Sequence, residues 1–548
     1  MTLTVQPNSA KEAATLERID AAVTAGNMPL AQDMARAALV SGLMHPKLLH
    51  LRSFWWAQRG RNDEAIADLR QAVAIAPSDV LVRHAYGVLL AKLERWPESI
   101  AELRAAIEVM PDFAPARVAL AWSQEAAGDL DGARRSCETA IALDSGSVEA
   151  LVRLARLAIR RADWETARAY SERALAFDSN HYTALATKAT LAIMDRDFVG
   201  AEALIGSLLG RDSGPTLNSA MVKGLLGDLR HVQGRYDEAY AAYSESNLDK
   251  YKLYAPRYGT SKPLAHYGEW LSAFFEAADR KTWSASGVSP GERDGAKEHV
   301  FLIGFPRSGT TLLEAILASH QNVCVLSERD AFVDLRIKFL NDEDGLGRLA
   351  ALGPDEMERC RAAYWRRVRE FGEEVNGKVF VDKMPLATLK LPLIAKLFPR
   401  AKVIFARRDP RDVVLSCFRR NFGMNHALFE FLSLERTARF YGAVMRFAAT
   451  AHATFDLNWH ETRNEALIRD FEGEARAVCD FISVEWDARM HAFAEHASTR
   501  TLRTPSSTQI MRGVNSSGVD AWRHYEKQIA GVMPILQPWI VRLGYPQD

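Results

Sequence analysis

The stretch HVFLIGFPRSGTTLLEAILASH, residues 299–320, decides the fold of the C-terminal half. It begins with an apolar run of strand length, passes through a turn of glycine, proline and serine, and ends in an amphipathic helix pattern. A strand, a glycine-containing turn and a helix bring backbone amides and the positive end of a helix dipole to one point. Gly304 and Gly309 permit close backbone approach to an anion there. The segment therefore predicts an anion-binding loop in an α/β domain.

The spacing of the two glycines matches a triphosphate-binding loop, but the residues after them do not. Thr310 and Thr311 stand where such a loop has a lysine followed by a hydroxyl residue. The cation lies earlier, at Arg307 inside the loop. A P-loop kinase or nucleotide hydrolase stays an alternative, because KVFVD, ending at Asp382, is similar to the strand that holds Mg²⁺ in those enzymes. The missing lysine argues against it.

A second motif follows about 100 residues later, in KVIFARRDPRDVVLSCFRR, residues 402–420. The pattern predicts a buried strand, a turn, and a helix with Asp409 as its N-cap and Pro410 in its first position. Arg408 leaves the strand end, and Ser416 lies two helical turns further on. A guanidinium and a hydroxyl are suitable donors for a phosphate.

Together, FPRSGTT and the Arg–Ser pair eight residues apart resemble the two nucleotide motifs of the sulfotransferase family. The resemblance implies 3′-phosphoadenosine 5′-phosphosulfate (PAPS) as sulfuryl donor and no metal. It implies that Arg408 and Ser416 bind the 3′-phosphate. The loop residues implied to bind the 5′-phosphosulfate are Pro306, Arg307, Ser308, Gly309, Thr310 and Thr311.

The same resemblance implies the catalytic residues. Lys383, in KVFVDKMPLATLK, is similar to a lysine of protein-tyrosine sulfotransferases, and with Arg307 it would stabilise the leaving phosphate. Glu328, in VCVLSERDAF, lies 21 residues after Arg307, which is similar to the spacing of the catalytic base in that branch. A surface charge is the alternative for Glu328. His320 is the alternative base.

Near the C-terminus, RTPSSTQIMRGVNSSGVDAWRHYEKQI, residues 503–529, resembles the segment that closes over the nucleotide in this family. Trp522 and Tyr525 are expected to anchor it. The implied donor contacts are Ser506, Gln509 and Arg512.

The N-terminal half repeats with a period of 34 residues. One column of small residues consists of Ala31, Ala65, Ser99, Ala133, Ala167 and Ala201. Small residues at fixed points are needed where helix backbones approach closely. The pattern resembles the tetratricopeptide repeat family, with about six units over residues 16–210 and an offset unit at 225–246. Such repeats form a superhelix whose groove binds a peptide or protein, and self-association is the alternative use.

Composition excludes several other classes. Among 548 residues, 69 Lys plus Arg balance 69 Asp plus Glu, so the chain has no overall basic field for nucleic acid or an anionic membrane. The five cysteines form no CxxC pair, which favours a reducing compartment. The N-terminus lacks a signal-peptide pattern, and no run approaches 18 apolar residues. These patterns predict a cytoplasmic protein without a membrane span.

The prediction for the whole chain is an α-helical tetratricopeptide superhelix joined to a P-loop-like α/β sulfotransferase domain with a central parallel sheet. The expected boundaries are repeats at 1–245, a linker at 246–296 with one helix over 266–283, and the sulfotransferase domain at 297–548. The expected reaction is sulfuryl transfer from PAPS to a hydroxyl. A tyrosine-like peptide or protein is the expected acceptor, and a glycan, a lipid or a small alcohol is the alternative. A non-catalytic repeat scaffold with a degenerate nucleotide domain is the remaining alternative.

Overall fold

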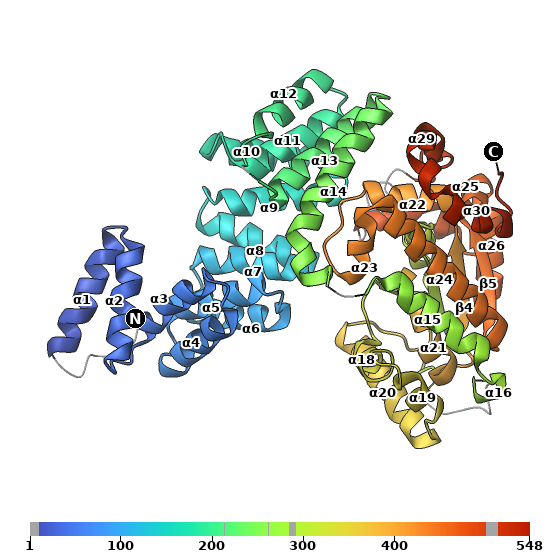
Figure 1. Ribbon diagram of the computed structural model, residues 1–548, viewed down its shortest axis with the longest axis horizontal. Coiled ribbons are helices and arrows are strands. Elements are labelled where there is room, and N and C mark those ends of the chain that lie inside the picture. The colour runs from blue at the N-terminus through green and yellow to red at the C-terminus, as the bar shows by residue number, and fades with distance from the viewer. Residues whose placement is uncertain (1–9, 213, 261, 284–291, 500–512, 548) are drawn as a thin grey trace. The chain divides into compact units, whose positions relative to one another are not determined.

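The computed structural model describes residues 10–212, 214–260, 262–283, 292–499 and 513–547. Helical repeats are followed by an α/β domain, and Figure 1 labels many of the helices and the strands β4 and β5. The chain separates into two compact units, the first made of residues up to 158 with 164–184, and the second of 159–163 with 185–548. This separation lies within the repeats, and the division at 245 and 296 stays a prediction.

The repeats of the first unit are helices of 12–15 residues joined by short turns. Ser99 stands in the alanine column, where it is fully buried and its hydroxyl donates to the Gly87 carbonyl at 2.7 Å. A Cβ on Gly87 would lie 2.6 Å from Leu103 Cγ, so the two helices of this repeat need glycine where they meet. The helices are α1 Ala10–Thr24, α2 Met28–Val40, α3 Pro46–Ala57, α4 Asn62–Ile75, α5 Val80–Lys92, α6 Trp96–Val109, α7 Ala114–Ala126, α8 Leu130–Leu143, α9 Val148–Arg160 and α10 Trp164–Phe177.

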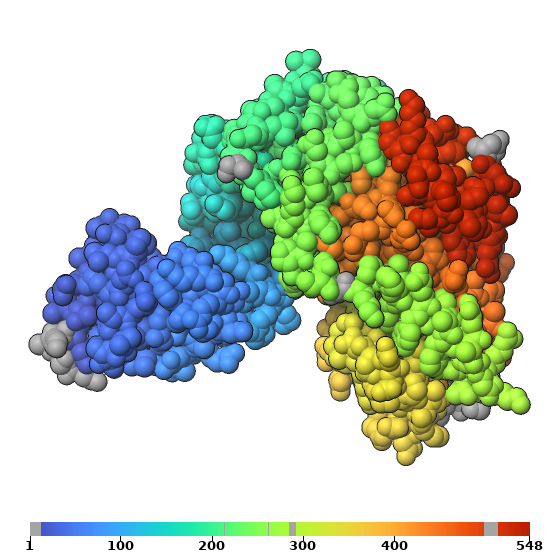
Figure 2. Space-filling model, viewed as in Figure 1, coloured from blue at the N-terminus to red at the C-terminus, as the bar shows by residue number. Residues whose placement is uncertain are grey.

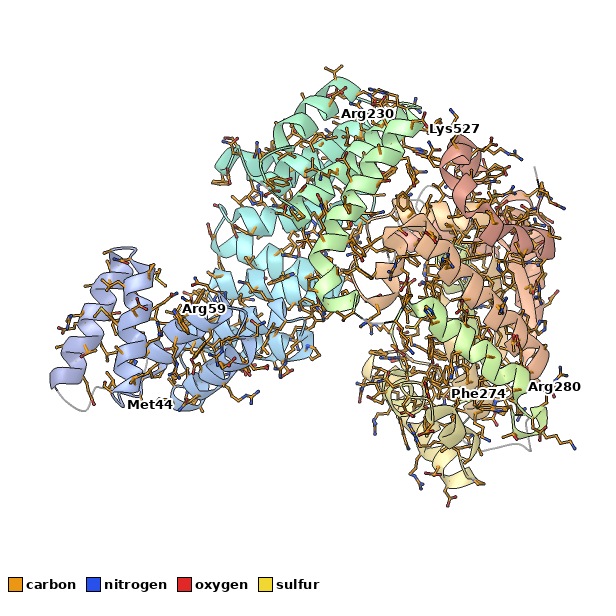
Figure 3. The ribbon with its side chains drawn as sticks, viewed as in Figure 1. Met44, Arg59, Arg230, Phe274, Arg280 and Lys527 are labelled. Carbon is orange, nitrogen blue, oxygen red and sulfur yellow. The ribbon has the colours of Figure 1, made fainter. Side chains whose placement is uncertain are left out.

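Most of α11 and the helices between it and the sheet belong to the second unit. These are α11 Tyr182–Met194, α12 Phe198–Leu208, α13 Leu217–Val232, α14 Tyr236–Tyr258, α15 Leu264–Ala277 and α16 Arg280–Trp283. The single helix expected over 266–283 is therefore two helices, α15 and α16. Ala278 is extended, and the Asp279 carboxylate accepts from the Lys281 amide at 3.0 Å, which starts a new helix. Figure 3 labels Phe274 and Arg280 on these two helices.

Helix α14 joins the repeats to the α/β domain within this unit. Asn247 is buried, and its Nδ2 donates to the Phe418 carbonyl at 2.9 Å. The Arg419 guanidinium lies over the rings of Tyr243, also in α14, and Tyr525. The Tyr525 hydroxyl in turn lies 2.9 Å from Nδ1 of His231, a residue of α13. Figure 2 shows the C-terminal segment against α13 and α14.

Removing the Asn247 amide tests this contact. We expect Asn247→Ala to lower the free energy of unfolding by about 1–3 kcal/mol, because the Phe418 carbonyl is left buried without this donor. Urea denaturation followed by circular dichroism measures the change. Ser244→Ala is the matched control in the same helix, since its hydroxyl only adds a second bond to the Tyr240 carbonyl. Equal losses in both variants would contradict the prediction.

The α/β domain has a five-stranded sheet in the order β2-β3-β1-β4-β5, and all neighbouring strands are parallel. The predicted central parallel sheet is confirmed. The strands are β1 Glu298–Gly304, β2 Val323–Ser327, β3 Val379–Lys383, β4 Lys402–Arg407 and β5 Asn458–Arg463. Because the strands run the same way, their carboxyl ends meet at one edge, where ligands bind in open α/β sheets.

Helices cover both faces of this sheet. On one face, Val300 and Leu302 pack in a cluster with Ile316 of the helix after β1. On the other, Phe301 and Ile303 pack in the larger cluster, which also contains Phe275 of α15. The helices are α17 Thr310–Ala318, α18 Val333–Phe339, α19 Gly345–Ala350, α20 Pro354–Glu370, η1 Pro385–Lys390, α21 Leu391–Leu397, α22 Pro410–Arg419, α23 His426–Phe429, η2 Glu430–Leu432, α24 Leu434–Thr454, α25 Asn464–Arg469, α26 Phe471–Ile482, η3 Ala488–Ala492, α27 Phe493–Thr499, η4 Ala521–Tyr525, α29 Glu526–Ile529, η5 Ala530–Val532 and α30 Met533–Arg542.

Across the described residues, the structure contains no helix that combines the length and the apolar character needed to cross a bilayer.

Candidate active site

The loop between β1 and α17 has the conformation that its glycines predict. Gly304 has φ +154°, and a Cβ there would overlap the Ala406 carbonyl oxygen of β4. Gly309 has φ +94°, and a Cβ there would lie 2.5 Å from Asn464 Oδ1. Both positions therefore require glycine. The loop ends at the first turn of α17, where Gly309 makes no side-chain cap and the backbone amides of a helix start favour an anion.

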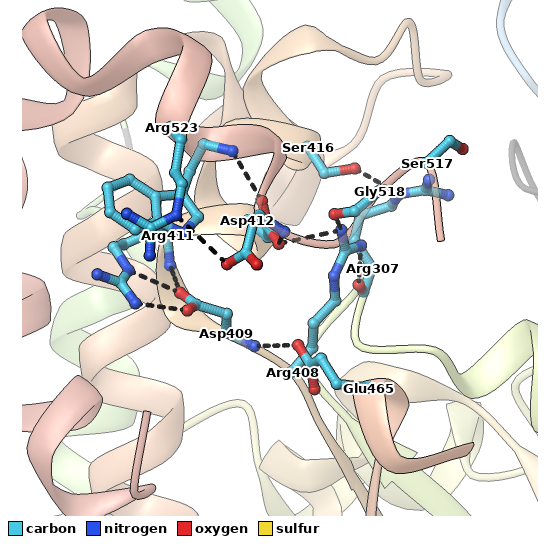
Figure 4. Close-up of polar contacts among 12 residues, drawn as sticks. Arg307, Arg408, Asp409, Arg411, Asp412, Ser416, Glu465, Ser517, Gly518 and Arg523 are labelled. Atoms are coloured by element: carbon cyan, nitrogen blue, oxygen red, sulfur yellow. Dashed lines mark hydrogen bonds and ion pairs between the residues drawn. The ribbon is translucent and has the colours of Figure 1, made fainter. Parts of the chain in front are cut away.

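The second motif also folds as predicted, with Asp409 as the N-cap of α22 and its carboxylate accepting from the Arg411 amide at 2.9 Å. The two motifs meet in space (Figure 4). Arg307 Nε donates to Ser416 Oγ at 2.9 Å, and Arg408 Nη1 donates to the Arg307 carbonyl at 3.2 Å. Residues about 100 positions apart in the chain thus form one cluster.

Positive charge is concentrated in this cluster. Burial, together with the neighbouring guanidiniums of Arg420 and Arg408, lowers the pKa of Arg307 to about 9. Arg307 also has φ +72°, in the left-handed region that non-glycine residues seldom adopt. A bound anion would relieve the mutual repulsion of these guanidiniums.

The C-terminal segment is attached to the same cluster. Arg408 Nη2 donates to the Gly518 carbonyl, while the Asp412 carboxylate accepts from the amides of Asp520 and Trp522, each at 2.9 Å. Trp522 is buried beneath the Arg411 guanidinium, whose carbon lies 3.8 Å from the ring centroid. Trp522 and Tyr525 are thus buried in the positions expected of anchors. Ser506, Gln509 and Arg512 lie outside the described residues.

Across the strand ends, Lys383 and Glu328 form an ion pair. Lys383 ends β3 with no exposed surface, and its Nζ lies 2.6 Å from Glu328 Oε1 and 2.7 Å from Glu314 Oε2. Burial opposes the charged ammonium, but the carboxylates of Glu314 and Glu328 outweigh it and raise the pKa of Lys383. The Glu328 side chain is 33% exposed, so it is open to solvent on one side.

The Lys383–Glu328 pair and the arginine cluster interact electrostatically. The Glu328 carboxylate acts to raise the pKa of Arg307, against the effect of burial. The structure therefore gathers Arg307, Ser416, Arg408, Lys383 and Glu328 at the carboxyl edge of the sheet. The rest of the predicted loop continues this group, with Ser308, Thr310 and Thr311 buried and Pro306 and Gly309 partly exposed.

Comparison with known proteins identifies the two parts of the chain. Residues 299–488 match the model of the sulfotransferase family, and residues 56–117, 86–148 and 124–191 match models of the tetratricopeptide repeat. The chain carries tetratricopeptide repeats and a sulfotransferase-family domain.

Relatives in the curated proteins align with less than half of the chain. An uncharacterised protein of Aquifex aeolicus is 29% identical over 262 residues, which are 46% of this chain and 34% of that protein. Protein-tyrosine sulfotransferase 1 of Danio rerio is 25% identical over 45% of this chain and 72% of its own length. Protein-tyrosine sulfotransferase A of Caenorhabditis elegans is 22% identical over 45% of this chain and 67% of its own length. The chain thus spans about a third of the Aquifex protein.

Two solved structures are similar to part of this chain. The Pseudomonas aeruginosa pilF structure has 18% identity and a TM-score of 0.34, and covers 38% of this chain and 94% of its own. A tetratricopeptide repeat protein from Parabacteroides merdae has 15% identity and a TM-score of 0.35, and the match covers 43% of this chain and 93% of that protein's chain.

His320, the alternative base, lies at the wrong edge of the sulfotransferase domain. It follows α17 and precedes β2, so it stands at the amino end of that strand. Its Nδ1 accepts from the Asn322 amide at 3.0 Å, and its Nε2 lies 2.8 Å from the Glu485 carbonyl. Both ring nitrogens thus contact backbone groups. His320 is therefore a structural residue here, and the alternative in which it acts as the base is wrong.

Asp382, which carried the kinase alternative, lies on the face of β3 opposite Lys383. It is buried and accepts from the Tyr364 hydroxyl at 2.7 Å. Burial raises the pKa of Asp382 from 3.8 to about 7, while the Tyr364 hydrogen bond and Lys390 act against that rise. A carboxylate in these surroundings faces the core and not the loop, which removes the observation that favoured a kinase.

The pKa of Asp382 makes stability depend on pH. The native state holds this proton until about pH 7, whereas the unfolded chain releases it near pH 3.8. The free energy of unfolding therefore falls as pH rises through this window, by roughly 1.4 kcal/mol per pH unit from this group alone. We expect Asp382→Asn to remove that fall. Urea denaturation of both proteins at pH 5, 6, 7 and 8 measures the difference, and parallel curves would contradict the prediction.

Sequence reasoning missed Glu314 and Asp412. Glu314 is an acidic residue in an otherwise apolar helix, TTLLEAILA, and that isolation was the available signal. Asp412 follows a helix N-cap, where an acidic residue is ordinary, so its role in holding Asp520 and Trp522 becomes visible only in the fold.

Proposed function

We propose that the chain is a PAPS-dependent sulfotransferase that transfers a sulfuryl group to an acceptor hydroxyl, with a tyrosine-like side chain of a peptide or protein as the acceptor. The observation that carries the proposal is the joining of Arg307, Ser416 and Arg408 at the start of α17, with the Lys383–Glu328 pair within electrostatic reach. Similarity to protein-tyrosine sulfotransferases supports the acceptor class.

The donor set fits a nucleotide with two separate anionic groups. Three guanidiniums, a hydroxyl and the loop amides before α17 are all hydrogen-bond donors. Gly309 keeps the loop free of a side chain where the backbone passes Asn464. We assign the loop to the 5′-phosphosulfate, and Arg408 with Ser416 to the 3′-phosphate.

Each residue then has a defined part in direct in-line transfer. PAPS supplies an activated sulfuryl group on a phosphate leaving group. Glu328 takes the acceptor hydroxyl proton as the new S–O bond forms and the S–O bond to phosphate breaks. Lys383 and Arg307 balance the charge of the electron pair left on the phosphate oxygen, so the products are a sulfate ester and 3′-phosphoadenosine 5′-phosphate.

The repeats are proposed to bind the peptide or protein partner, with self-association as the alternative. The guanidinium carbons of Arg36 and Arg59 each lie 3.9 Å from the centroid of the Trp55 ring in α3, and neighbouring Phe54 is 46% exposed. Aromatic and arginine side chains of this kind are enriched in protein interfaces.

A cytoplasmic location is proposed because all five cysteines are buried free thiols.

Calorimetric titration with 3′-phosphoadenosine 5′-phosphate in EDTA tests the proposal, beside adenosine 5′-phosphate as the control that lacks the 3′ group. A clear preference for the 3′-phosphorylated nucleotide without metal is the expected result. Binding of neither nucleotide would favour the scaffold alternative, and magnesium-dependent binding of ATP would favour a kinase.

A further inference from the structure

The order of the strands places α17 above the end of β3. The chain runs from β1 through α17 to β2, but β3 lies between these two strands in the sheet. The crossover helix therefore passes over β3, and Glu314 in its second turn contacts the last residue of that strand, Lys383. This contact follows from topology, since the two residues are 69 positions apart.

The resulting cluster has two carboxylates for one ammonium. Lys383 has no exposed surface and the Glu314 side chain is 4% exposed, whereas Glu328 on the other side of the ammonium is 33% exposed. The groups that act on the Lys383 charge come from two elements, Glu314 from α17 and Glu328 from the loop after β2. Asp382, the neighbour of Lys383 in β3, is directed to Tyr364 on the opposite face.

A buried ammonium needs a counter-charge at every stage of a reaction. If Glu328 were its only partner, protonation of Glu328 by the acceptor would leave Lys383 as an uncompensated buried charge, and Lys383 would tend to lose its proton. That would occur at the moment when the leaving phosphate needs a cation. The second carboxylate, shielded from solvent, removes this conflict.

We propose that Glu314 is a positioning residue that keeps Lys383 charged and in place while Glu328 changes its protonation state. The role rests on the proposed sulfotransferase function. It separates two tasks that a single Glu–Lys pair cannot perform together: Glu328 exchanges the proton with the acceptor, and Glu314 holds the charge of the cation that faces the leaving group.

The charge of Lys383 can be followed without turnover. The Cε–Hε signal of Lys383 in protein labelled with ¹³C-lysine, assigned by its loss in Lys383→Arg, reports its titration by NMR. In Glu314→Gln we expect the midpoint to fall by about one pH unit or more, because burial then acts against one carboxylate instead of two. Glu430→Gln is the matched control, since Glu430 is equally buried but pairs with Arg436. An unchanged Lys383 midpoint in Glu314→Gln would overturn the proposal.

A second variant avoids any change in the core. Glu328→Gln imitates the protonated base at a partly exposed position, and we expect Lys383 to stay charged in it at pH 9. Loss of the Lys383 charge in Glu328→Gln would show that Glu314 is insufficient and would also overturn the proposal.

Turnover gives a third measurement, with 4-nitrophenyl sulfate and 3′-phosphoadenosine 5′-phosphate as substrates of the reverse reaction. We expect the alkaline limb of the pH profile to move to lower pH in Glu314→Gln, and a limb that does not move would contradict the proposed role. Failure of the unmodified protein to bind the nucleotide would overturn the proposed function and the catalytic part of this role, whereas the NMR titrations would still show whether Glu314 keeps Lys383 charged.

Discussion

Arg408→Ala is expected to weaken the binding of 3′-phosphoadenosine 5′-phosphate by about 10- to 100-fold, with little change for adenosine 5′-phosphate. A charge-assisted hydrogen bond to phosphate contributes roughly 1.5–3 kcal/mol, which corresponds to this range. The Arg408 guanidinium is held at the strand end by the Arg307 and Gly518 carbonyls and faces Asp412. Calorimetric titration with the two nucleotides measures the effect.

The nucleotide pair separates loss of a phosphate contact from loss of local structure. Arg408 also supports the loop through the Arg307 carbonyl, so a general collapse of the site would weaken both nucleotides equally. Arg463→Ala is the matched control, because Arg463 ends the neighbouring strand β5 and lies over Tyr545. Equal weakening of both nucleotides in Arg408→Ala, or the same selective loss in Arg463→Ala, would contradict the assignment of the 3′-phosphate.

Local patterns in the sequence predicted the local parts of this fold. The apolar run before Gly304, the N-cap at Asp409 and the alanine column each depend on neighbours within one turn, one strand or one repeat. The same is true of Gly309, whose φ is positive in the structure. Patterns of this kind are short enough to be read directly from the chain.

Features that depend on distant residues could not be predicted in the same way. The order β2-β3-β1 places Glu314 on Lys383, and nothing near either residue indicates it. The continuation of α14 to Tyr258 likewise depends on its packing against the α/β domain, including the Asn247 bond to Phe418. His320 was plausible as a base by residue type alone, and only its place at the amino end of β2 excludes it.

Glu328→Gln is expected to lower kcat by about 10²- to 10⁴-fold, the range that a general base contributes. The amide keeps the size of the side chain and an oxygen for the Lys383 ammonium, which Glu328 Oε1 contacts at 2.6 Å. The amide cannot take up the proton of the acceptor hydroxyl. Affinity for 3′-phosphoadenosine 5′-phosphate is expected to stay within about threefold, because Arg408 and Ser416 are unchanged and Lys383 retains Glu314.

Single-turnover transfer from labelled PAPS and calorimetric titration, made on the same preparations, measure the two quantities. Glu343→Gln is the control, an exposed glutamate of the same domain. Unchanged turnover in Glu328→Gln would exclude Glu328 as the base. Loss of nucleotide affinity together with turnover would instead place Glu328 itself in the donor site beside Lys383, because a base that acts only on the acceptor has no reason to affect a nucleotide that lacks the sulfuryl group.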